Sequence, residues 1–234
     1  MVCPPSGGGS CARLVVVALP GRDGDDEVVT DWVAVATGLV VGHPAVDRVE
    51  FAGSRSRGTH HDLSDWDFAV ETSDFESLAA DLPGLVAPLS PLSQQWEPMG
   101  TFPVYQVLLP GLTKIEYLFL DRSQEPRPPL RPDRDTLAAI NTHFWDWIWW
   151  IATKGAAGRP ALVAEHLARM QAQILAPMGI STAPTSIGAA VEVFVQRRDA
   201  LEAELGLTVD RRLEREVRQG IDRLHLQESS QFPR

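Results

Sequence analysis

Residues 51–70 read FAGSRSRGTHHDLSDWDFAV, and this stretch decides how the first half of the chain folds. The run 48–52 is typical of a short strand that ends at Gly53 and Ser54, and a second strand, 66–70, follows a polar loop. Glycine lets the backbone approach a phosphate closely, and exposed N–H groups at such a turn bind oxyanions. We therefore predict that Gly53 and Ser54 form a nucleotide-binding turn between two strands.

Two acidic residues, Asp65 and Asp67, stand two apart where the second strand begins. Residues at this spacing point to one face of a strand, so Trp66 and Phe68 would point to the core. Two carboxylates directed at one point repel each other unless a cation neutralises them. Mg²⁺ suits the pair because it prefers oxygen ligands and substrate phosphates. We predict that Asp65 and Asp67 are metal ligands and catalytic residues.

A third acid, Glu116, lies in the second arm of a predicted hairpin, where residues 105–109 and 113–120 flank the turn dipeptide Pro110-Gly111. Bulky apolar residues surround Glu116 in the sequence, and an isolated carboxylate among them is costly unless it has a partner. A metal ion or an acceptor hydroxyl would supply one, so we predict Glu116 as a metal ligand or a general base. A glutamate on an exposed edge strand would need neither partner, and that alternative stays open.

Together these residues resemble the motif of the DNA polymerase beta-like nucleotidyltransferase superfamily, over about twenty residues. The resemblance rests on Gly53-Ser54, on Gly58 and on the run Ser64-Asp65-Trp66-Asp67. It implies Mg²⁺ as cofactor and a nucleoside triphosphate, ATP in the first instance, as co-substrate. It also implies that Asp65 and Asp67 bind the metal, that Gly53 and Ser54 hold the triphosphate, and that Glu116 completes the site.

Four prolines between Ser123 and Pro132 favour an extended connector, and they mark a predicted domain boundary. Before it, apolar spacing predicts a helix over 28–41, and Ser73 with Glu76 has the spacing of a capping box at the start of another helix. Beyond it, apolar residues recur at helical spacing from Leu137 to Leu224, which predicts a bundle.

The predicted fold class is therefore α+β. A mixed-sheet nucleotidyltransferase domain, 27–125, would be followed by an all-helical bundle domain, 133–228. The Gly/Ser/Pro-rich segment 1–26 is predicted to be mobile, because it has little apolar surface to bury. The helical second half resembles that of the aminoglycoside adenylyltransferases, in which a helical domain closes one wall of the acceptor pocket.

Charge and cysteine content restrict the partners. The formal net charge of −10 disfavours long nucleic acid and would attract a cationic small molecule. Cys3 and Cys11 form no disulfide framework or metal cluster, which favours a reducing, cytoplasmic location. The apolar run 14–19 is too short to span a bilayer, so we expect no membrane role.

Some residues allow two interpretations. Lys154 could contact the triphosphate as a point charge, or it could stabilise a helix C-terminus. His60 and His61 are interpreted as solvated loop residues. The tryptophans of the first bundle helix are predicted to pack in the core and between domains, since a helix apolar on nearly every side is normally buried.

The function predicted from the sequence is Mg²⁺-dependent transfer of a nucleoside monophosphate to a hydroxyl of a small molecule, such as an aminoglycoside-like antibiotic. Two alternatives remain: transfer to a protein or RNA end, and a nucleotide-binding regulator without activity. The loose spacing of Arg159 and His166, which resembles that of small helical ribonuclease domains, keeps a toxin–antitoxin setting with a protein acceptor open. The oligomeric state is not predicted.

Overall fold

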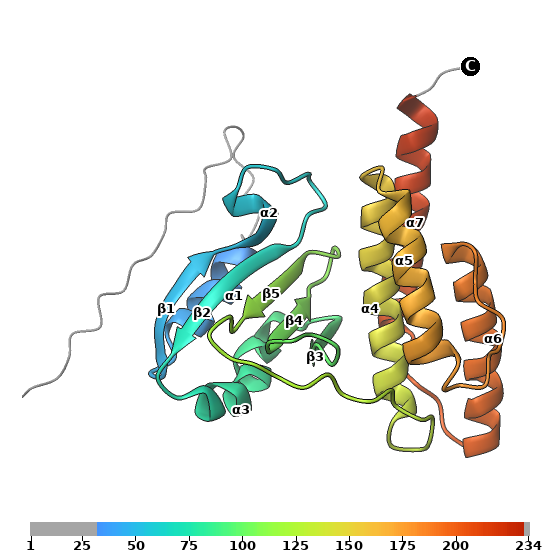
Figure 1. Ribbon diagram of the computed structural model, residues 1–234, viewed down its shortest axis with the longest axis horizontal. Coiled ribbons are helices and arrows are strands. Elements are labelled where there is room, and N and C mark those ends of the chain that lie inside the picture. The colour runs from blue at the N-terminus through green and yellow to red at the C-terminus, as the bar shows by residue number, and fades with distance from the viewer. Residues whose placement is uncertain (1–31, 232–234) are drawn as a thin grey trace, which may run out of the picture.

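The computed structural model describes residues 32–231, with side chains as far as Leu224. A sheet-containing half is followed by a helical half (Figure 1), which confirms the predicted α+β class. The elements of the first half are α1 (Trp32–Val41), β1 (Val46–Phe51), α2 (Gly53–Ser56), β2 (Trp66–Thr72), α3 (Phe75–Val86), η1 (Ala87–Leu89), β3 (Ser93–Trp96), β4 (Val104–Leu108) and β5 (Lys114–Leu118). Those of the second half are α4 (Leu137–Ala156), α5 (Pro160–Met170), η2 (Gln171–Leu175), α6 (Ile187–Leu205) and α7 (Arg212–Gln231).

The five strands form one mixed sheet in the order β1-β2-β5-β4-β3. Strands β2 and β5 are parallel, and the other neighbours are antiparallel. The predicted hairpin is β4–β5, and it turns through Gly111 and Leu112, both with positive φ. Strand β3 was not predicted, because its sequence Ser-Gln-Gln-Trp is mostly polar and only pairing with β4 makes it a strand.

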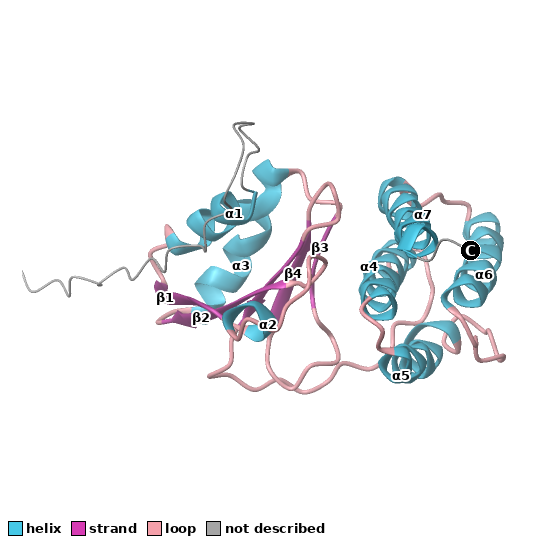
Figure 2. Cartoon of the chain, turned by 90° about the horizontal axis from the view of Figure 1, so that it is seen from above, coloured by secondary structure: helices cyan, strands magenta, loops and turns pink. Residues whose placement is uncertain are grey.

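The sheet has two chemically different faces because side chains alternate along each strand. One face packs under α1 and α3 (Figure 2) and contributes large apolar residues to a shared core, including Phe68, Val107 and Tyr117. The opposite face carries Gln106, Lys114 and Glu116, together with the two aspartates at the start of β2. The period-two pattern thus separates a core face from a face rich in charged side chains.

The second half packs around α4, whose neighbours are α5, α6 and α7. Its core also takes in Leu108 and Leu112 from the hairpin, so α4 lies against the charged side of the sheet. The Trp149 indole N–H donates to the Leu112 carbonyl at 3.2 Å, which ties α4 to the hairpin turn. Trp145, Trp147 and Trp149 are buried, as predicted for core residues, whereas Trp150 of the same predicted set is only partly buried and donates to Asp65.

The prediction of a Ser73–Glu76 capping box is wrong. Helix α3 begins at Phe75, and its N-cap is Asp74, whose carboxylate accepts a hydrogen bond from the Ser77 N–H at 3.0 Å. Asp74 is an equally good cap by residue type, and the cap falls on it because Thr72 still belongs to β2.

The segment 1–26, with Cys3 and Cys11, lies outside the described residues, as does the beginning of the helix predicted over 28–41. The proline-rich stretch has no regular secondary structure from Arg122 to Pro132. The division into domains 27–125 and 133–228 remains a prediction. Within residues 32–231, no helix combines the length and the hydrophobicity needed to cross a membrane.

Candidate active site

The three predicted acids lie at neighbouring positions on the charged side of the sheet. Asp67 and Glu116 are register partners across the parallel strands β2 and β5. Asp65 precedes β2 by one residue and therefore shares the face of Asp67. Residues far apart in sequence thus meet because β2 and β5 are adjacent in the sheet.

Gly53 begins the short helix α2 directly after β1, and its φ of 64° is in the left-handed region. A Cβ at this position would overlap the Asp67 carboxylate. The Ala52 N–H donates to the Asp67 carbonyl at 2.9 Å, which fixes the turn to β2. Ser54 follows in the first turn of α2, so the two residues of the predicted nucleotide-binding turn lie next to β2, the strand that carries Asp67. Gly53 has a second use that the sequence did not reveal, namely to leave room for Asp67.

Arg55 holds the loop before β2 in place. Its guanidinium donates to the Ser64 carbonyl at 2.8 Å and to the Asp65 carbonyl at 3.2 Å, and it lies 3.9 Å from the centre of the Trp66 ring. These contacts connect α2 to the start of β2. Arg55 thus fixes the backbone that carries Asp65.

Helix α4 reaches the site through Lys154 and Trp150, which are four residues apart and share one helix face. The Lys154 ammonium and the Trp150 indole N–H both donate to Asp65 Oδ2 at 3.1 Å. The Lys154 ammonium also lies 4.8 Å from the centre of the Trp150 ring. Lys154 is therefore part of the site, in contact with Asp65.

Glu116 lies in a network of polar groups. Its carboxylate accepts a hydrogen bond from Gln106 Nε2 at 3.0 Å and lies 3.7 Å from the Lys114 ammonium. Lys114 in turn forms a buried ion pair with Asp146 of α4 at 2.6 Å, and the Ser93 hydroxyl donates to the other oxygen of Asp146. Burial raises the pKa of Glu116 to about 7, against the opposing effect of Lys114.

Two of the three acids, Asp67 and Glu116, have raised pKa values. Burial, with the neighbouring Asp65 carboxylate, also raises the pKa of Asp67 above its ordinary value. All three donors are carboxylates, which suits a hard cation such as Mg²⁺. Among the described residues, no three His, Cys, Asp or Glu side chains are arranged as a metal site, and Asp65 is bound to Lys154. Lys154 and Trp150 both contact Oδ2 of Asp65, so metal binding through that oxygen would have to displace them.

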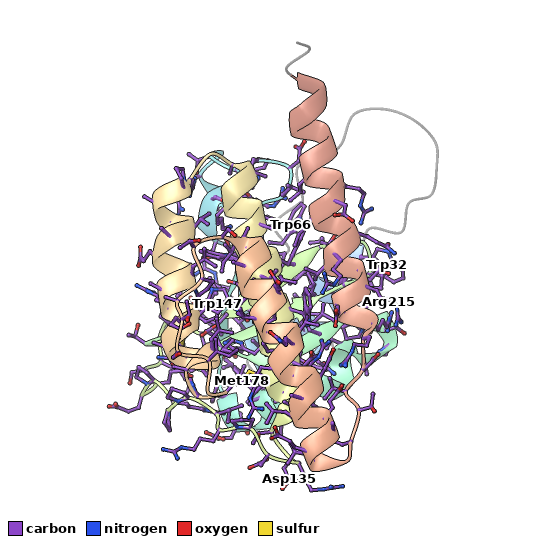
Figure 3. The ribbon with its side chains drawn as sticks, turned by 90° about the vertical axis from the view of Figure 1, so that its right-hand side faces the viewer. Trp32, Trp66, Asp135, Trp147, Met178 and Arg215 are labelled. Atoms are coloured by element: carbon purple, nitrogen blue, oxygen red, sulfur yellow. The ribbon has the colours of Figure 1, made fainter. Side chains whose placement is uncertain are left out.

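A cavity of about 280 Å³ opens beside Glu116, between the sheet and helices α4 and α5. Its walls combine aromatic side chains, such as Trp147 and Trp150, with polar ones, such as Glu97 and Gln106. Figure 3 looks onto the helical half and labels Trp147 on α4. A pocket of mixed aromatic and polar lining next to a candidate base is suited to hold an acceptor molecule.

Four residues of the site were not predicted as site residues: Gln106, Lys114, Asp146 and Trp150, of which Trp150 was predicted only to pack in the core and between domains. A signal existed for two of them. Lys114 stands two residues before Glu116 and so shares its face, and Trp150 stands four residues before Lys154. Gln106 and Asp146 carried no such signal, because their proximity depends on strand pairing and on how α4 packs. His61, which was predicted to be a solvated loop residue, accepts a hydrogen bond from the Leu63 N–H within its own loop.

Sequence comparison finds no matching family model and no significant match among curated proteins. Among solved structures, the chain is similar to an aminoglycoside 6-adenyltransferase from Bacillus subtilis, with a TM-score of 0.32 and 12% identity over 83% of this chain and 97% of that one. It is also similar to the polymerase core of TRAMP, an RNA surveillance complex, with a TM-score of 0.32 and 15% identity, over 49% of this chain and only 34% of that one. Similarity at this level says nothing about activity, so function is inferred from the site.

Proposed function

We propose that this protein is a Mg²⁺-dependent nucleotidyltransferase that moves a nucleoside monophosphate, AMP from ATP in the first instance, onto a hydroxyl of a small molecule. The observation that carries the proposal is the placement of Asp65, Asp67 and Glu116 on one face of adjacent strands, with Gly53 packed against Asp67. Three carboxylates on one partly buried face are unfavourable in an ordinary sheet and useful in a site that receives a cation.

Each residue has a role in this reaction. Backbone N–H groups at Gly53 and Ser54 would bind phosphate oxygens, and Lys154 would add a positive charge to the triphosphate after it leaves Asp65. Mg²⁺ held by Asp65, Asp67 and Glu116 would neutralise charge on the triphosphate and on the leaving pyrophosphate.

Glu116 is the candidate general base as well as a candidate metal ligand. As a base it would take the proton of the acceptor hydroxyl while that oxygen forms a bond to the α-phosphorus and the bond to pyrophosphate breaks. A pKa of about 7 is well placed for this, because a base works best when its pKa is near the operating pH. The cavity beside Glu116 is the place for the acceptor. A small antibiotic as acceptor would make the protein a resistance factor, acting in the cytoplasm.

The test is release of pyrophosphate from each of the four nucleoside triphosphates, with Mg²⁺ or with excess chelator. Acceptors would be streptomycin, kanamycin, a short RNA and a bacterial protein extract. We expect release with a small-molecule acceptor and Mg²⁺ only. Release with RNA or protein alone would support a macromolecular acceptor, and nucleotide binding without any release would support a regulator.

Two matched substitutions test the site itself. Asp67→Asn should lower turnover by at least about 100-fold, because it removes one of the negative charges that would hold Mg²⁺. Asp62→Asn changes an exposed acid in the loop before β2 and should leave turnover within about twofold of the parent. Equal turnover in the two variants would contradict the proposed site.

A further inference from the structure

His143 of α4 has an imidazole ring that is buried without a partner. Both of its ring nitrogens are shielded from solvent, and neither has a hydrogen-bond partner among the described residues. Buried polar groups are almost always hydrogen-bonded, because losing water without replacement is unfavourable. His143 also lines the cavity beside Glu116 and borders a second cavity under the proline-rich segment.

Two other well-buried or half-buried histidines have partners within the fold. His166 lines the same cavity, and its Nδ1 accepts a hydrogen bond from the Trp147 indole N–H at 3.1 Å. His43 accepts from the Ala45 N–H and contacts the Asp81 carboxylate at 3.1 Å. The fold thus pairs these two rings and, within the described part of the chain, leaves both nitrogens of His143 unpaired in the wall of a cavity.

The chemistry of the ring indicates what it could bind. Burial holds the pKa of His143 below its ordinary value, although the nearby Glu97 and Asp146 carboxylates oppose this effect and Lys114 adds to it. A neutral imidazole has one N–H donor and one nitrogen acceptor. A hydroxyl group matches it, because a hydroxyl both donates and accepts.

We propose that His143 is a specificity-determining residue that hydrogen-bonds a hydroxyl of a compact polyol acceptor, seated against Trp147 with its reactive hydroxyl toward Glu116. The inference rests on the proposed function and deepens it. The volume of about 280 Å³ is near the lower end of ligand pockets, about 300–1,000 Å³, which suits one ring better than a polymer. Trp147 and Trp150 contribute apolar surface to the lining, and Glu97 and Gln106 contribute polar groups for further hydroxyls.

The test measures binding of streptomycin, glucosamine and myo-inositol to the full chain by ligand-observed NMR and calorimetry, without nucleotide. His143→Phe keeps the ring and removes both nitrogens, and His143→Asn keeps a donor and an acceptor. A polyol that binds the parent should bind His143→Phe at least about 10-fold more weakly, with His143→Asn in between. The melting temperature of His143→Phe should equal or exceed that of the parent, because the substitution removes two unpaired buried groups.

His43→Phe is the matched control, since it removes a histidine that has partners and lies away from the cavity. It should lower the melting temperature and leave polyol affinity unchanged. Equal polyol affinity in His143→Phe and the parent would make His143 a packing residue and overturn the inference. Binding of none of the polyols, or of a short oligoribonucleotide alone, would overturn the acceptor class.

Failure of the proposed function gives a different result. If polyol binding depends on His143 but Mg²⁺-ATP neither binds nor releases pyrophosphate, the nucleotidyltransferase proposal fails and the role of His143 in ligand recognition stands. If Mg²⁺-ATP binds equally well to the parent and to His143→Phe while polyol affinity falls, the proposed function and the role of His143 are both supported.

Discussion

At the scale of single residues, Glu116 has two candidate roles that one substitution separates. Glu116→Gln keeps the shape and the carbonyl but removes the charge, so turnover should fall by about 10²–10⁴-fold, the contribution of a positioned acid or base. If Glu116 is mainly a base, calorimetry should find Mg²⁺-dependent ATP affinity preserved. If it is mainly a ligand, affinity and turnover should fall together. Turnover within about twofold of the parent would remove Glu116 from the site.

The same substitution should stabilise the metal-free protein. The folded-state pKa of Glu116, about 7, lies above its ordinary value of 4.5 because the carboxyl is buried. The unfolded chain then binds fewer protons between these two values, so this group makes the parent less stable as pH rises through the window. In chelator at pH 8, Glu116→Gln should be more stable than the parent by about 1–3 kcal/mol, and the difference should shrink toward pH 4.5. Urea unfolding at several pH values measures it. A constant difference, or a less stable variant, would show that burial does not raise this pKa.

Two glycines allow a matched comparison of backbone strain and crowding. Gly53 and Gly58 have nearly the same φ, 64° and 65°, but a Cβ would meet Asp67 at Gly53 and open space at Gly58. Gly58→Ala should lower the free energy of unfolding by about 1 kcal/mol and leave turnover nearly unchanged. Gly53→Ala carries the same backbone cost and also displaces Asp67, so turnover should fall at least about 10-fold. Similar kinetics for the two variants would mean that Asp67 tolerates displacement.

At the scale of elements, the ion pair between Lys114 of β5 and Asp146 of α4 connects the sheet to the helical half. Both side chains are almost fully buried. Burial alone would lower the pKa of Lys114, but the Asp146 and Glu116 carboxylates raise it, so the ammonium stays charged. The positively charged Lys114 ammonium therefore neutralises the buried Asp146 carboxylate.

Replacing one member of this ion pair should lower the free energy of unfolding strongly. Replacing both members together should lower it much less. Lys114→Met leaves Asp146 buried without its cation and should destabilise the protein by about 3–5 kcal/mol in urea unfolding. The double variant Lys114→Met/Asp146→Leu should recover a large part of that loss, because Asp146 is removed together with its cation and Glu116 keeps its hydrogen bond from Gln106. A double variant that is as unstable as the sum of the two single variants would show that the pair is not coupled.

At the scale of the whole molecule, the site is assembled from both halves, because Asp65 comes from the sheet and its partners Lys154 and Trp150 come from α4. Mg²⁺-ATP should therefore stabilise the entire chain. At about 100 times the dissociation constant, a ligand adds about 2.7 kcal/mol to the stability, which raises the melting temperature. ATP with chelator should raise it much less.

Lys154→Met should reduce this shift, because it removes a positive charge that would contact the triphosphate. Arg215→Met, which removes an exposed positive charge on α7 (Figure 3), is the control and should leave the shift unchanged. If Mg²⁺-ATP raises the melting temperature of Lys154→Met as much as that of the parent, Lys154 does not contact the triphosphate and is only a partner of Asp65.

The sequence by itself determined the candidate acids and most of the local elements, though not strand β3. Alternation along β2 placed Asp65 and Asp67 on one face, Pro110-Gly111 fixed the hairpin, and helical spacing fixed the bundle, because each of these patterns is a property of neighbouring residues. The capping box failed by one residue, since Ser73 and Asp74 are both good caps and the end of β2 decides between them.

Only the tertiary structure decided which distant residues meet. The pairing of β2 with β5 brought Glu116 beside Asp67, and the packing of α4 brought Lys154 to Asp65, Asp146 to Lys114 and His143 to the cavity. Such contacts depend on strand order and on the position of the helices. Both are set by the burial of whole apolar faces, so no regular spacing of residues along the sequence indicates these contacts. The acids could therefore be named from the chain, whereas their partners could be named only from the fold.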